Sequence, residues 1–134
     1  MIFGADALLE RVAQHAAMLG VPMPLDVATM QAIVAEAERV AGGRVDDEPA
    51  ALFYACAHSA RLLGKVAGPF LDKIAPAQAN AVGLVLHASE LDLVLLRGRI
   101  AFGVIGWEDV RVDFATWLTP PGQKPKRTAS KRPR

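Results

Sequence analysis

His58 and Lys65 are the residues whose types and spacing come closest to a reactive site. His58 falls near the predicted end of a helix, where the negative end of the helix dipole favours a protonated imidazole. Lys65 follows Gly64 in a predicted loop, where its ammonium group and exposed backbone amides could together hold an anion. We therefore take His58 as a candidate catalytic residue, and Gly64 with Lys65 as a candidate anion-binding site. The alternative is a surface histidine beside a solvated lysine.

Other reactive-site patterns do not match this sequence. Ser59 stands where a phosphate-binding loop needs its first glycine, and Val66 stands where it needs Ser or Thr. Cys56 and His58 are two residues apart on a predicted helix, so their side chains point in different directions and do not form a nucleophile pair. Cys56 is the single cysteine, which excludes an internal disulfide and a multi-cysteine zinc site, and we expect it in the core. We predict no metal and no cofactor.

The C-terminal segment 119–134 is strongly basic. Residues 1–118 hold nine Lys/Arg against all fourteen Asp/Glu, a net charge of −5, whereas residues 119–134 hold six Lys/Arg and no acid. Four prolines and almost no apolar side chains predict that this tail is disordered. Such a tail is typical of contact with phosphate backbones, and the alternatives are a solubilising tail or one that docks on the acidic body. The six cations are Lys124, Lys126, Arg127, Lys131, Arg132 and Arg134.

Composition predicts an all-α domain over residues 1–118. The 134 residues suit one domain, and 24 alanines against eight aromatic residues favour closely packed helices over sheet. The first residues lack a basic stretch followed by an apolar run, so we expect no signal peptide. The most apolar stretch, 74–96, is interrupted by His87, Glu90 and Asp92, so we expect no membrane contact and a cytoplasmic protein.

The apolar spacing predicts a bundle of about six helices around one buried central helix. The stretch 64–75 is predicted to be less regular, because Gly68-Pro69 breaks the chain and Phe70, Leu71 and Ile74 suggest only a short helical turn. Pro76 fits the start of a new helix. That helix is apolar nearly all round, so we predict that it is central, with Leu84 and Val85 buried. Replacing Leu84 by alanine would then cost about 2–5 kcal/mol. The expected helices span residues 8–19, 27–40, 49–63, 77–87, 90–96 and 107–118, with a loop or short extended segment at 99–105.

The order of these segments resembles that of the Fic/Doc (death-on-curing) toxin family, which are small all-α domains. In that family an acid-rich stretch precedes a long helix, a loop and an alanine-rich buried helix. The matching segments here are Asp46-Asp47-Glu48, residues 49–63, 64–75 and 76–87. The end of the domain is also similar: Gly83-Leu84-Val85-Leu86 leads into Ser89-Glu90-Leu91, then Gly98-Arg99-Ile100 and a closing amphipathic helix.

The family's nucleotide-transfer motif is largely absent from this chain. The motif reads His-Pro-Phe-x-Asp/Glu/Ala-Gly/Ala-Asn-Lys/Gly-Arg, and only His58 and Lys65 fall on matching positions. Leu62 replaces the magnesium-binding acid, Gly64 the asparagine and Val66 the final arginine, so the resemblance implies a degenerate member. We therefore predict no transfer of AMP or phosphate to a protein.

Three kinds of function remain open at this stage. The first is a toxin-module relative that binds a protein partner, such as an antitoxin-like segment, in a cleft between helices. The second is an accessory protein that binds nucleic acid non-specifically through the basic tail or forms homo-oligomers through the acidic body. The third is an enzyme whose site is assembled from scattered residues.

Overall fold

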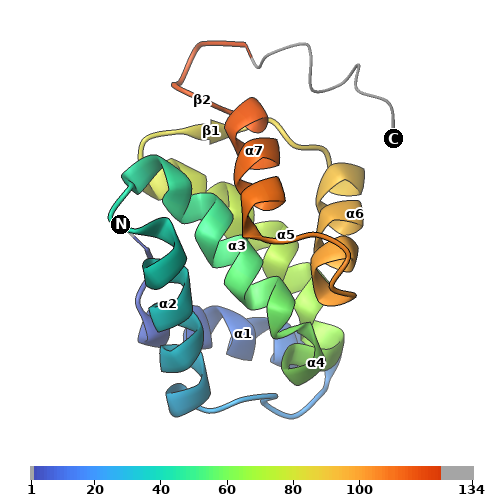
Figure 1. Ribbon diagram of the computed structural model, residues 1–134. Helices are drawn as coiled ribbons and strands as arrows, with labels where there is room; N and C mark the ends of the chain where they lie inside the picture. Colours follow the sequence, from blue (N-terminus) through green and yellow to red (C-terminus); the bar gives the residue numbers. More distant parts are fainter. Residues whose placement is uncertain (1, 125–134) are drawn as a thin grey trace.

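The computed structural model describes residues 2–124, and these form an all-α fold (Figure 1). Six helices of eleven residues or more lie in this part of the chain, which confirms the predicted fold class. They are α1 (Ala5–Leu19), α2 (Val27–Ala41), α3 (Glu48–His58), α5 (Ala67–Ala81), α6 (Glu90–Ala101) and α7 (Trp107–Trp117). The shorter elements are α4 (Ala60–Leu63), the 3-10 turns η1 (Val45–Asp47) and η2 (Gly64–Val66), and the strands β1 (Val85–Leu86) and β2 (Leu118–Thr119).

Local capping residues set several helix ends. The Asp26 side chain accepts a hydrogen bond from the Thr29 amide at 2.9 Å at the start of α2. The Ser89 hydroxyl accepts a hydrogen bond from the Asp92 amide, and the Asp92 carboxylate accepts one from the Ser89 amide, which forms a capping box at the start of α6. Gly20 ends α1 in the left-handed conformation, with φ 68°.

The central helix is α3. It runs through the middle of the molecule and contacts α2, α5, α6 and α7 (Figure 1). Its side chains are buried from Pro49 to Ala57 with the one exception of Tyr54, because small alanines alternate with Leu52, Phe53 and Cys56 and let neighbours approach on every side. The expected core position of Cys56 is confirmed, and Leu52 and Phe53 are fully buried as well. The expected helix 49–63 is interrupted at Ser59, and its last turn is the separate α4.

The predicted break at 64–75 and the predicted central helix at 77–87 are wrong, although residues 70–74 and 77–81 are helical. α5 begins at Ala67, continues through Pro76 and ends at Ala81, so residues 77–87 are not the central helix. Pro69 lies in the first turn, where its missing N–H would have had no partner within the helix. Pro76 gives up one internal hydrogen bond, and the burial of Phe70, Ile74 and other α5 side chains offsets that loss.

Leu84 and Val85 lie beyond α5 and are only half-buried. Val85 and Leu86 form β1, which pairs antiparallel with β2, matching Val85 to Thr119 and Leu86 to Leu118. The expected boundary between residues 118 and 119 therefore falls inside this pair, where Thr119 is 8% exposed. The tail cation Lys124 is exposed, and residues 125–134, with the other five tail cations, lie outside the described part of the chain.

The C-terminal helices differ from prediction mainly in length. The expected helix 90–96 is too short, since α6 continues to Ala101 because Ile100 is fully buried and anchors the last turn. Of the segment 99–105, residues 99–101 are therefore helical, and residues 102–105 form turns and bends, which agrees with the loop alternative and not with the extended one. The expected helix 107–118 is confirmed as α7, with Val110, Phe114 and Trp117 in the core. Among residues 2–124, no helix combines the length and apolar character needed to cross a membrane.

Candidate functional site

His58, Gly64 and Lys65 lie close to one another in the chain but line none of the four cavities described below. His58 is the exposed last residue of α3, and its ring packs edge-on against Tyr54 with centroids 4.6 Å apart. Gly64 and Lys65 are exposed in η2. The candidate anion site and the candidate catalytic role of His58 stay predictions. Cys56 is fully buried, and burial raises the pKa of its thiol to about 12, so it stays protonated at neutral pH.

The largest of the four cavities is a cleft between α1, α5, β1 and α6. Its volume is about 590 Å³, within the range of ligand sites. Apolar side chains cover much of its surface, and five ionisable groups from three helices reach it. We call it the α1–α5–α6 cleft; its lining residues are His15, Met18, Gly68, Pro69, Asp72, Lys73, Pro76, Leu86, Ala88, Glu90, Leu93 and Arg97.

An ion pair joins two walls of this cleft. The Nε atom of Arg97 on α6 lies 3.6 Å from Oδ1 of Asp72 on α5. Neither atom is solvent-exposed or makes a hydrogen bond, so the pair is held at a distance slightly too long for one. The guanidinium passes close over Gly68, where an added Cβ would lie 3.1 Å from Nη2 of Arg97. Glycine at position 68 therefore permits this placement of Arg97.

The environment of Asp72 disfavours its charged form. Burial raises the pKa of its carboxyl group above the usual value of 3.8, and the nearby Glu90 carboxylate acts in the same direction. The positive charge of Arg97 acts against the effect of burial and lowers the pKa of Asp72. Lys73 also lowers this pKa, but by the smallest amount. A carboxyl group shifted upward in a cleft is typical of sites that bind ligands or move protons.

Removing the Arg97 charge should raise the pKa of Asp72 further. In Arg97→Gln the burial of the carboxyl group remains but its main counter-charge is lost, so the carboxylate is less stable. The titration is measured by NMR on the Asp72 side-chain carboxyl carbon. Lys73→Gln is the matched control and should move the pKa less, because Lys73 is the smallest contributor. Equal shifts in the two variants would contradict the ion pair.

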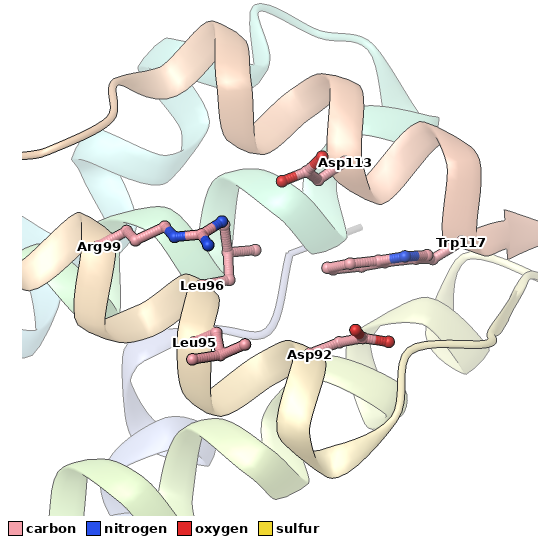
Figure 2. A pocket seen from close by; sticks show the side chains of 6 residues that line it. All are labelled: Asp92, Leu95, Leu96, Arg99, Asp113 and Trp117. Carbon is pink, nitrogen blue, oxygen red and sulfur yellow. The ribbon is translucent and has the colours of Figure 1, made fainter. Parts of the chain in front are cut away.

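A second, smaller pocket lies between α6 and α7 (Figure 2). The indole ring of Trp117 lies between the carboxyl groups of Asp113 and Asp92, and Arg99 reaches in from the opposite side (Figure 2). Asp113 is 7% exposed. The Asp92 carboxylate already accepts a hydrogen bond from the Ser89 amide in the capping box. The volume is about 110 Å³, below the roughly 300 Å³ of small ligand sites, so this pocket suits water or a single inserted side chain.

The two remaining cavities are also lined in part by charged residues, namely Asp46, Asp47 and Arg111 in one and Asp6 and Glu38 in the other. One, of about 250 Å³, lies beside Leu84, Phe114 and Leu118. The other, of about 340 Å³, is a shallow depression between the start of α1 and α2. Within residues 2–124, no three His, Cys, Asp or Glu side chains are grouped so that they could hold a metal ion.

No family model, curated protein or solved structure matches this chain. The site must therefore be argued from its own residues. The sequence analysis missed the α1–α5–α6 cleft because its walls are far apart in the chain. One usable signal was present: Asp72 and Arg97 each follow a buried leucine directly, which places a charge at the edge of a buried helix face.

Proposed function

We propose that this protein acts by binding a segment of a partner protein in the α1–α5–α6 cleft, without nucleotide transfer. The observation that carries the proposal is the combination of apolar walls with charges of both signs in the largest of the four cavities. Met18 at its edge is 81% exposed, and methionine is common on surfaces that adapt to peptide side chains. Leu86 and Leu93 extend the apolar wall, and Lys73 and Glu90 supply exposed charges.

The chemistry of the segment follows from these walls. Asp72 and Arg97 neutralise one another, which leaves Lys73 on α5 and Glu90 on α6 as charges open to a ligand. The segment should carry apolar side chains for the walls, a carboxylate for Lys73 and a basic group for Glu90. The resemblance to the Fic/Doc family places a loop at residues 64–75 and a buried helix at 76–87, whereas η2 and α5 occupy residues 64–81, so this part of the correspondence does not carry over. The substitutions at Leu62, Gly64 and Val66 support binding over transfer.

A random peptide library displayed on phage tests the proposal directly. Selection on the full chain should enrich peptides that contain apolar residues together with at least one acidic and one basic residue. Met18→Glu should weaken their binding by about tenfold or more, because a carboxylate would enter an apolar contact. Met23→Glu is the matched control, since Met23 is 43% exposed and does not line the cleft.

A second pair of variants separates the cleft from the anion site predicted from sequence. Lys73→Glu should weaken the selected peptides, whereas Lys65→Glu should not, because both lysines are exposed but only Lys73 lines the cleft. The proposal would be contradicted if no peptides were enriched. It would also be contradicted if the enriched peptides depended on Lys65 and not on Met18 or Lys73.

A second function is favoured by the charge distribution. The six cations of residues 119–134 contrast with a body of net charge −5, and this supports weak, non-specific binding of nucleic acid through the tail.

A further inference from the structure

Helix α6 is apolar on two opposite faces, and only one of them is covered. Leu93, Leu96 and Ile100 face the core and are at most 5% exposed. Leu91, Leu95 and Phe102 are 65%, 49% and 87% exposed. Spacings of four, three and four residues place Leu91, Leu95, Gly98 and the C-cap residue Phe102 on one line on the side of α6 away from the core, and Leu95 also borders the α6–α7 pocket. We call this line the outer stripe of α6.

Gly98 interrupts the outer stripe, although no neighbouring atom within the same chain would clash with a larger residue there. It lies inside the helix, where glycine is less favourable than alanine, and a Cβ added there would meet no atom within 4 Å. The space above Gly98 is therefore open in one protomer. A glycine in the middle of an exposed apolar stripe lets a second helix approach closely, and α6 lies at the edge of the molecule where one could (Figure 1).

We propose that two copies of this chain associate through their α6 helices, packed antiparallel with the two-fold axis midway between Leu95 and Gly98. In this register Leu95 of each protomer packs over Gly98 of the other, and Leu91 packs against Phe102. The large side chains thus meet the gap left by glycine, and each contact occurs twice, as an isologous interface requires. In a parallel pair each residue would instead face its own copy, so Gly98 would lie opposite Gly98 and Leu95 would not fill the space above it.

The charges on α6 favour the same orientation. Its first turn carries Glu90 and Asp92, and its second half carries Arg97 and Arg99. Asp92 and Arg99 lie on the same side of the outer stripe, at the edge of the α6–α7 pocket (Figure 2). Antiparallel packing brings Asp92 of one protomer to within about one helical turn of Arg99 of the other. Parallel packing would place acid beside acid and base beside base.

The expected dimer is of moderate affinity. A twelve-residue helix is about 18 Å long, and one pair of such helices buries less than the roughly 800 Å² per partner of a standard interface. We therefore expect a dissociation constant in the micromolar range. Sedimentation equilibrium of the full chain at about 0.1 mM should give twice the monomer mass of 14.3 kDa. A monomer at that concentration would overturn the proposal, even if a different protein were found to cover the stripe.

Two substitutions test whether the outer stripe of α6 forms the interface and whether the two helices pack closely at Gly98. Leu95→Glu should raise the dissociation constant by about a hundredfold or more, because each dimer contains two copies of the change. Gly98→Leu should have a similar effect by filling the space for the opposite Leu95. At dilutions where both proteins are monomers, Gly98→Leu should unfold at no lower urea concentration than the native chain. Leu62→Glu on α4 is the control, since Leu62 is 53% exposed and lies outside the stripe. A dimer insensitive to both stripe variants would overturn the proposal.

Cysteine cross-linking tests the register. A mixture of Leu91→Cys and Phe102→Cys proteins should form a mixed disulfide faster than either forms with itself, because positions 102 of the two protomers would lie about 16 Å apart along the axis. The native Cys56 is buried and does not interfere. Preferred formation of the 102–102 disulfide would indicate parallel packing and contradict the antiparallel register.

Discussion

Phe53→Ala should lower the free energy of unfolding by about 3–5 kcal/mol, the largest effect we expect from one core substitution. Phe53 is fully buried on the central helix α3, and its ring lies 5.4 Å from that of Phe114 on α7. Truncation removes this contact and leaves a cavity that the surrounding helices cannot fill without moving. A typical domain is stable by only about 5–15 kcal/mol, so a large share of the total would be lost. Urea denaturation measures the change.

Leu84→Ala is the matched control for that experiment. Leu84 is half-buried beside a cavity of about 250 Å³, where part of its surface is already in contact with solvent. Its replacement should cost about 1 kcal/mol or less, not the 2–5 kcal/mol that the sequence predicted for a central position. Equal losses for the two variants would mean that α3 is not the centre of the core.

The sequence predicts those parts of the fold that neighbouring residues determine. The caps at Asp26 and Ser89 bond to amides only three residues away, and Gly20 ends α1 by its own backbone conformation. These interactions can be read from a short window of sequence. The fold class follows from them together with the apolar spacing.

Long-range contacts determine what the sequence analysis missed. α5 continues through Pro76 because its buried side chains hold it in place, including Gln78, which is fully buried and accepts a hydrogen bond from the Phe3 amide 75 residues away. The α1–α5–α6 cleft likewise depends on how α5 and α6 pack, since Asp72 and Arg97 meet only in the folded chain. The low helix propensity of proline predicts that a helix does not continue through Pro76. Tertiary packing of α5 outweighs this preference.

Truncation after Lys124 should abolish the nucleic-acid binding that the basic tail predicts. The cut removes five of the six tail cations and leaves a chain of net charge −4, which repels a polyanion. It is placed after residue 124 because the Gln123 amide donates to the Pro120 carbonyl and Thr119 contacts Gln123, so the turn at 120–123 belongs to the folded body. Thermal stability should then change little, because no core residue is lost.

The salt dependence of the full chain separates charge from any sequence preference. Contacts to about four to six phosphates give a log–log slope of roughly −4 to −5 on duplex DNA, so affinity should fall about 250- to 1000-fold between 50 and 200 mM salt. A full-length variant with glutamine at Lys126, Arg127, Lys131, Arg132 and Arg134 keeps the length but not the charge, and should behave like the truncation. A tail that instead docks on its own acidic body predicts the reverse: no DNA binding even at low salt, and a lower melting temperature in both variants. Gel shifts and melting curves on the three proteins decide between these outcomes, because only a tail free to reach phosphates gives steep salt dependence with unchanged stability.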